Sequence, residues 1–91
     1  MRLVARQPIS SADTPSTVLM ERVFEVDCLP DLDVPFTSEG VEQPRRIESM
    51  VFDASEGSYV LVLAGETGST QSDKDALIAH YVRYGWTKKR T

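Results

Sequence analysis

A chain of 91 residues makes one small domain, and 41% hydrophobic with 26% charged residues is the composition of a folded protein. A single cysteine excludes an intrachain disulfide and a cysteine-rich zinc site, and a single histidine excludes a multi-histidine metal site. Residues 1–82 hold all 14 acids and six basic residues, a net charge of −8, whereas the last nine residues carry +4. Such an acidic body attracts basic partners and repels nucleic acid over most of its surface.

The sequence shows no targeting or membrane segment. Its first ten residues include two arginines but no apolar run long enough for a signal peptide. No stretch approaches the ~18 consecutive apolar residues of a membrane span. Because a lone cysteine also points to a reducing compartment, we expect a soluble cytoplasmic protein with no membrane partner.

Two strands are predicted in the first third of the chain. Residues 2–6 suit a short strand that stops before the first proline, and residues 9–16 have the composition of a loop. Residues 17–28 alternate between two faces, which predicts a long strand with one buried face. A helix with Thr14 as N-cap and Pro15 at its first position is the alternative. We favour the strand because β-branched and aromatic residues cluster in its second half.

Residues 29–44 are predicted to be an irregular acidic loop. Three prolines, Pro30, Pro35 and Pro44, are spaced too closely for a helix or a strand to form. A connection of this length in a compact domain is often functional.

A β-hairpin is predicted next. Residues 46–53 and 58–64 are two strand-like runs around a short turn that contains glycine. The second run is apolar on both faces, which indicates a central strand. Residues 65–71 are expected to form a loop.

The strongest local signals define a helix at residues 73–84. Ser72 is the expected N-cap, with an acid three residues later completing a capping box. Gly85 is placed to adopt the left-handed conformation that ends a helix in a Schellman motif. Trp86 would then fold back onto Tyr81.

These elements predict an α+β fold: a small three- to four-stranded antiparallel sheet with one C-terminal helix packed on a face. Residues 1–91 form a single domain, with the acidic loop at 29–44 and a basic C-terminal tail at 87–91. The pattern leaves the strand order and the oligomeric state open. Because so short a chain has a thin core, a homodimer would add burial.

No constellation predicts catalysis, a metal or a cofactor. His80 lies at the border of the apolar helix stripe, with no acid or nucleophile placed to work with it. Cys28 is expected to be a buried small hydrophobe rather than a nucleophile. The glycine-containing segment 65–70 lacks the lysine and spacing of a phosphate-binding loop. Asp31 and Asp33 begin like a calcium loop, but a proline and a missing third ligand break that pattern.

The acids around the irregular loop suggest a binding surface. Five acids fall on or beside it: Asp27, Asp31, Asp33, Glu39 and Glu42. Three apolar residues lie among these acids: Leu32, Val34 and Phe36. An apolar anchor among charges is a common interface design, so we expect this patch to dock on a basic protein surface. The alternative is a solvated acidic face whose apolar residues cover the open face of the sheet.

The basic end supports a different hypothesis. Its members are Arg83, Trp86, Lys88, Lys89 and Arg90. An aromatic ring can stack on the bases of a single strand while cations hold phosphates. The competing interpretation, which we favour, is that Trp86 caps the helix and the cations complement its dipole.

The leading functional hypothesis is a non-catalytic protein-binding module, an adaptor or inhibitor with an acidic surface. A concrete version is a small phage or mobile-element inhibitor, of which anti-CRISPR proteins are one kind, that occupies a basic nucleic-acid groove on a host nucleoprotein machine. The alternative is a nucleic-acid-binding accessory protein that uses the basic tail. An enzyme would need residues from a second copy to complete its site.

Overall fold

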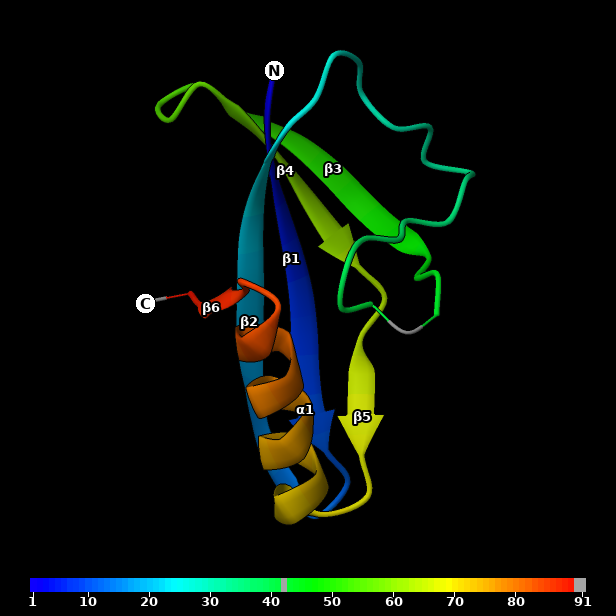
Figure 1. The fold of residues 1–91 in the computed structure, drawn as a ribbon, viewed down its shortest axis with the longest axis vertical. Helices are drawn as coiled ribbons and strands as arrows, with labels where there is room; N and C mark the ends of the chain where they lie inside the picture. Colours follow the sequence, from blue (N-terminus) through cyan, green and yellow to red (C-terminus); the bar gives the residue numbers. More distant parts are fainter. Residues whose placement is uncertain (42, 90–91) are drawn as a thin grey trace.

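The computed structural model describes residues 1–41 and 43–89 as one mixed β-sheet with a single helix on one face (Figure 1). Its elements are β1 (Arg2–Ser11), β2 (Thr14–Glu25), β3 (Ile47–Asp53), β4 (Ser58–Leu63), β5 (Glu66–Gly68), α1 (Gln71–Arg83) and β6 (Thr87–Lys88). The strand order is β3-β4-β1-β2-β6, and β5 also pairs with β1. The α+β class was predicted, but the expected three- to four-stranded antiparallel sheet is wrong, because the sheet has six strands and is mixed.

Strand β1 is the centre of the sheet and the reason for its mixed character. On one side it pairs antiparallel with β2, from Arg2 opposite Glu25 to the turn at residues 12–13. On the other side it pairs in parallel, first with β4 and then with β5. The β3–β4 hairpin therefore docks with β4 against β1, where the sequence predicted only antiparallel neighbours.

The predicted strand at 2–6 is too short, because β1 continues through Pro8 to Ser11. Met1 exchanges backbone hydrogen bonds with Val26, the residue after the end of β2, so by alternation Pro8 turns its backbone away from β2. On the opposite side of β1, the parallel pairing is interrupted at Pro8, because β4 pairs with residues 3–6 and β5 with residues 9–11. A residue without an N–H is tolerated at such a gap.

The buried side chain of Gln7 fills the same break. Its amide nitrogen donates to the carbonyl of Ala64 at 2.7 Å and to that of Pro8 at 3.1 Å. One side chain thus replaces the backbone bonds that the interrupted ladder lacks.

The strand predicted at 17–28 is confirmed as a strand, and the helical alternative is wrong, although β2 begins earlier and ends at Glu25. Its Phe24 begins a row of side chains that crosses four strands on the helix side. The register places Phe24 beside Leu3 of β1, Leu3 beside Tyr59 of β4, and Tyr59 beside Phe52 of β3. We call these four residues the aromatic row.

The β3–β4 hairpin is confirmed, and β4 is an interior strand as its two apolar faces predicted. In the turn, Asp53 accepts hydrogen bonds from the hydroxyl of Ser55 at 2.6 Å and from the backbone of Ser55 and Glu56. The Ser55 hydroxyl in particular holds the pKa of Asp53 below its ordinary value. Residues 65–71 were predicted as a loop, but three of them, Glu66–Gly68, form β5 beside residues 9–11.

Helix α1 begins earlier than predicted. Thr70, not Ser72, is the N-cap, and its hydroxyl accepts from the backbone of Asp73. The reason is that β5 runs directly into the helix: a Cβ on Gly68 would lie 2.8 Å from the backbone nitrogen of Lys74. The strand and the first turn therefore pack too closely for a longer loop.

The predicted Schellman motif at the helix C-terminus is confirmed. Gly85 has a φ of 92°, its N–H bonds the carbonyl of Val82 at 3.1 Å, and the N–H of Trp86 bonds that of Tyr81 at 3.1 Å. Arg22 of β2 donates to the carbonyl of Tyr84 at 2.8 Å, which places a cation at the negative end of the helix dipole. After this turn, Thr87–Lys88 of the predicted basic tail pairs with β2 as β6.

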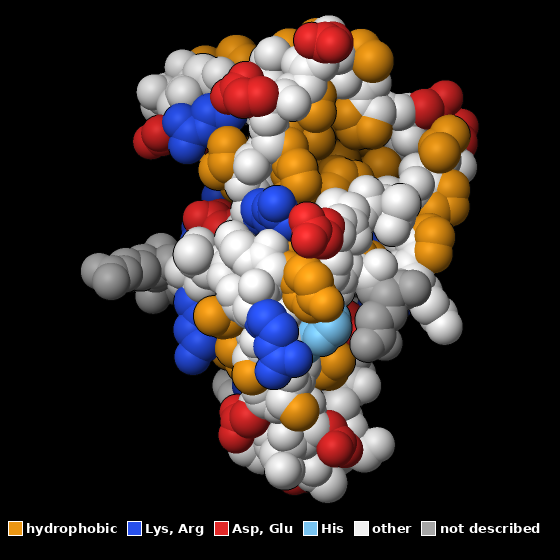
Figure 2. Space-filling model, in the orientation of Figure 1, with side chains coloured by type: hydrophobic (Ala, Val, Ile, Leu, Met, Phe, Trp, Pro, Cys, Tyr) orange, Lys and Arg blue, Asp and Glu red, His pale blue; other side chains and the backbone are white. Residues whose placement is uncertain are grey.

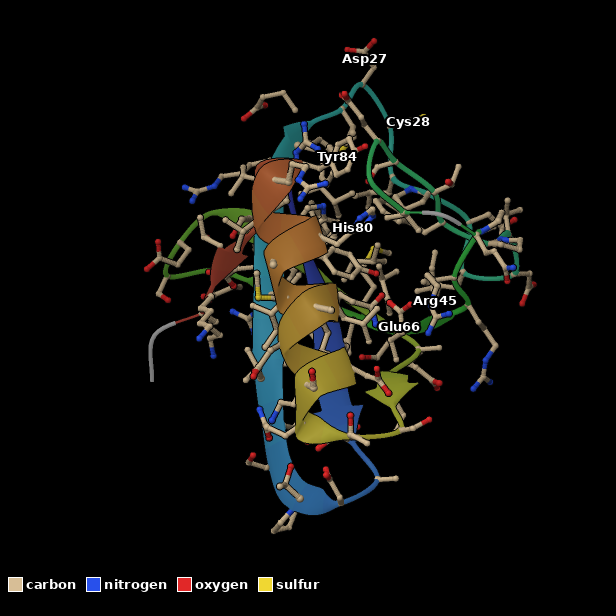
Figure 3. The ribbon with its side chains drawn as sticks, turned by 60° about the horizontal axis from the view of Figure 1, so that its bottom comes forward. Asp27, Cys28, Arg45, Glu66, His80 and Tyr84 are labelled. Carbon is tan, nitrogen blue, oxygen red and sulfur yellow. The ribbon has the colours of Figure 1, made fainter. Side chains whose placement is uncertain are left out.

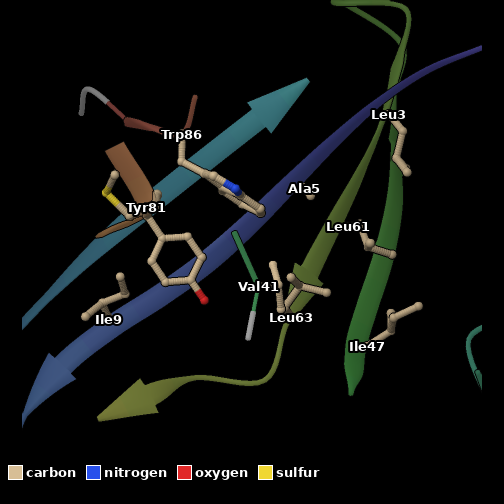
Figure 4. Packing of buried hydrophobic residues seen from close by; sticks show 10 residues of the cluster. Leu3, Ala5, Ile9, Val41, Ile47, Leu61, Leu63, Tyr81 and Trp86 are labelled. Carbon is tan, nitrogen blue, oxygen red and sulfur yellow. The ribbon is translucent and has the colours of Figure 1, made fainter. Parts of the chain in front are cut away.

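The C-terminal turn directs Trp86 into the core, where it is 1% exposed. Its ring lies 5.2 Å from that of Tyr81 and 6.3 Å from that of Phe24, both in edge-on geometry. Figure 4 shows Tyr81 and Trp86 packed among buried residues of the sheet and beside Val41 of the long connection between β2 and β3.

Within the described residues, no helix has the length and apolar character needed to cross a membrane.

We predict that Trp86→Ala lowers the free energy of unfolding by about 3–5 kcal/mol, because it leaves a cavity where helix, sheet and long connection meet. The control Val82→Ala lies on the exposed face of the same helix and should change stability by no more than about 0.5 kcal/mol. Urea unfolding followed by circular dichroism measures both. A loss at Trp86 no larger than at Val82 would contradict the core assignment.

Candidate functional site

The candidate site is the long connection between β2 and β3, residues 26–46, which we call the long loop. It leaves the end of β2 and bulges away from the sheet before it reaches β3 (Figure 1). Phe36 and Arg45 exchange backbone hydrogen bonds of 2.8 and 2.7 Å, which close its second half. The Phe36 ring also meets Phe24 of β2, with the ring centres 5.7 Å apart. The long loop is therefore fixed on the sheet although its described residues form no helix or strand.

The acids predicted to form the patch are carried on the outside of this loop. Asp27, Asp31, Asp33 and Glu39 are exposed, and none of these four forms an ion pair within the described part of the chain. Asp31 accepts a hydrogen bond from the backbone of Asp33 at 2.9 Å, which makes a tight local turn. Glu42 lies outside the described residues. The described acids keep their charge turned toward solvent.

The three predicted apolar anchors divide into two kinds. Leu32 is 46% exposed and Val34 is 56% exposed, next to Asp31 and Asp33. Phe36 is instead half-buried against the core. Leu32 and Val34 are thus available to a partner, while Phe36 holds the loop that carries them.

An apolar hollow opens beside the loop. Figure 2 shows hydrophobic side chains gathered above the helix, between the long loop and the strands. The aromatic row crosses this half of the sheet, and Phe36 covers its Phe24 end. At the other end Phe52 is 54% exposed, with its ring centre 4.9 Å from that of Tyr59. The row is covered at one end and open at the other.

A cavity of about 450 Å³ lies between α1, β5 and Gly40 of the long loop. Tyr81 donates its hydroxyl hydrogen to Glu66 at 2.7 Å, and His80 donates from Nε2 to the Gly40 carbonyl at 2.8 Å. A smaller hollow of about 220 Å³ shares Glu66 and Tyr81 and is also lined by Arg45. Figure 3 shows Arg45 and Glu66, two of the side chains that line it.

These polar groups fasten the long loop to the rest of the fold. The Arg45 guanidinium donates to the Gly65 carbonyl at 2.8 Å, and His80 is engaged with the Gly40 backbone. The cavity is lined by hydroxyl side chains, Thr67 and Ser69, and by the carboxylates of Glu66 and Asp73. The described residues also contain no cluster of three His, Cys, Asp or Glu side chains that could hold a metal ion. Sequence reasoning missed the hydrogen bonds of Arg45, His80 and Tyr81, because each joins residues that are 15 to 40 positions apart.

The described cations of the basic end lie apart from the Trp86 ring. Arg83 and Lys88 are exposed and Lys89 is half-buried, whereas the Trp86 ring is in the core. Arg90 lies outside the described residues. Trp86 therefore has no exposed face on which a base could stack.

Cys28 is exposed, so its expected burial is wrong. The prediction assumed a strand that reached residue 28, but β2 ends at Glu25 and leaves the thiol on the long loop. The segment 65–70, weighed as a phosphate-binding loop, supplies β5 and the N-cap of α1 instead.

No family model matches this chain, and no curated protein or solved structure matches it either.

We predict that Gly40→Ala destabilises the fold more than Gly57→Ala. Both glycines have positive φ, 91° and 65°, so both substitutions strain the backbone by about 1–2 kcal/mol. Only at Gly40 would the new Cβ also clash, 2.5 Å from Cβ of Tyr84, whereas nothing lies within 4 Å at Gly57. Urea denaturation should therefore show a larger loss at Gly40, by at least about 1 kcal/mol. Equal losses would mean that the loop does not pack on Tyr84.

Proposed function

We propose that this chain is a non-catalytic protein-binding module, an adaptor or inhibitor, that engages a basic surface through the long loop. The observation that carries the proposal is the exposure of Leu32 and Val34 beside Asp31 and Asp33, in a turn that the N–H of Val34 closes on the Asp31 carbonyl at 3.1 Å. Apolar anchors surrounded by charge are typical of interface hot spots. A loop already held in place loses little conformational entropy on binding.

The charge of the loop supports a basic partner. Its exposed acids have no counter-ion on this chain among the described residues, so their field is available for steering. The net charge of −8 over residues 1–82 adds to that field. We therefore expect the association rate to fall as salt concentration rises, since screening shortens the reach of the field.

A concrete form of the proposal is an inhibitor of phage or mobile-element type whose acids occupy the nucleic-acid groove of a host nucleoprotein machine. Such a target would be captured without its nucleic acid. We do not propose the nucleic-acid-binding alternative, because Trp86, the aromatic residue on which it depended, is buried.

We predict that Asp31→Lys/Asp33→Lys abolishes partner binding and leaves the fold intact, because both side chains are exposed. The matched control is Glu25→Lys/Asp75→Lys, which makes the same change in net charge at exposed acids outside the loop. Affinity capture from a nuclease-treated lysate of the source organism or its host, read by mass spectrometry, compares the two with the unmodified protein.

The expected result is one protein retained by the unmodified chain and by the control, but reduced at least about tenfold with the loop variant. Leu32→Ser/Val34→Ser, compared with Val82→Ser, tests the anchors in the same way. Retention of the same protein by all variants would refute the proposal. Recovery that depends on nucleic acid would refute it as well.

A further inference from the structure

The two outer edges of the sheet differ in how they are protected. On the β2 side, the two-residue β6 pairs only with Met20 and Glu21 and is followed by Lys89. Short edge strands and lysines are devices that prevent edge pairing. On the other side, β3 pairs with β4 alone. Within the described chain, the backbone of residues 48–53 makes no hydrogen bond to any segment other than β4.

The β3 edge also lacks the usual side-chain protection. After an irregularity near Glu48, residues 49–52 are uncharged and include neither lysine nor proline. Val51 is 60% exposed on the open face of the sheet, and Phe52 is exposed on the helix face. Large apolar side chains on both faces beside an unpaired backbone edge are the features of a strand that accepts a partner strand.

We infer that this edge pairs with the same edge of a second copy of the chain, antiparallel, about a two-fold axis that passes beside Val51 and is perpendicular to the sheet. Opposite residues of an antiparallel pair point to the same face, so each residue must meet one of equal orientation. With the axis at Val51, Met50 lies opposite the partner's Phe52 and Val51 lies opposite the partner's Val51.

The charges fit the same register. It places Ser49 opposite the partner's Asp53, and it brings Arg46 toward the partner's Glu56 in the acidic hairpin turn. Moving the axis to Met50 would instead place Glu48 opposite the partner's Phe52. Moving it to Phe52 would place Val51 opposite the partner's Asp53. Only the axis at Val51 matches apolar with apolar side chains and opposite charges at the ends.

The first test is a disulfide at the axis. Val51→Cys in a Cys28→Ser background removes the exposed native thiol and places two cysteines opposite each other, at a separation of about 4.5–5.5 Å between their Cα atoms. Under mild oxidation this variant should form a covalent dimer at least about tenfold faster than the control Val23→Cys/Cys28→Ser. Val23 is exposed on the same face of the sheet as Val51, but it lies on β2. Equal rates would overturn the register.

The second test is sedimentation equilibrium. The unmodified protein should be a dimer, Val51→Lys a monomer with unchanged circular dichroism, and Val23→Lys still a dimer. An unmodified protein that stays monomeric, or a dimer that survives Val51→Lys, would overturn the inference. Because these variants leave the long loop unaltered, the result does not depend on the proposed partner.

Discussion

The arrangement of this protein depends on one strand that is paired along both sides. Strand β1 pairs antiparallel with β2 and parallel with β4 and β5, so it fixes the register of the rest of the sheet. The interruption between β4 and β5 faces Pro8, the residue that can best tolerate it, and the Gln7 amide bonds across the gap. The Gln7 amide thus gives the Ala64 carbonyl a bond of 2.7 Å, where its other donor, Arg45, lies 3.4 Å away.

The parallel side of β1 also dictates the long loop. Since β3 is antiparallel to β4, and β4 is parallel to β1, β3 runs in the same direction as β2. Two strands of the same direction need a crossover of a dozen or more residues, which is usually a helix. Here three prolines exclude the helix, and an irregular segment crosses the helix side of the sheet. The length of the loop is thus explained by topology, and its functional interest comes from the exposed Leu32 and Val34 instead.

What could be predicted from the sequence was local. The β3–β4 hairpin and the helix end at Gly85 depend on residues within a few positions of each other, and both were predicted correctly. The mixed sheet was not, because Leu3 pairs with Tyr59 more than 50 positions away and either direction of pairing fits an apolar strand. Strand β5 is too short and too polar to show a pattern of its own, and it exists because residues 9–11 offer it an edge.

In the candidate site, too, local features could be predicted and long-range contacts could not. The acids and the exposed Leu32 and Val34 could be read from composition, because a loop rich in proline and acids belongs at the surface. The contacts that fix the loop could not, since His80 meets Gly40 and Arg45 meets Gly65 only after the crossover has been made. The packing of Phe36 on Phe24 could not be read from the sequence either, because it depends on the same crossover.

The two proposals are linked by geometry. A two-fold axis perpendicular to the sheet keeps each face on its own side, so both helices and both long loops of the dimer would lie on one face. The aromatic row, which is open at Phe52, would continue across the axis against the partner's Met50. Two acidic loops on one face would meet a basic surface together, and the second contact would then form at high effective concentration. A weak single-loop contact is therefore compatible with tight binding by the dimer, and breaking the β3 edge would weaken partner binding without changing any residue of the loop.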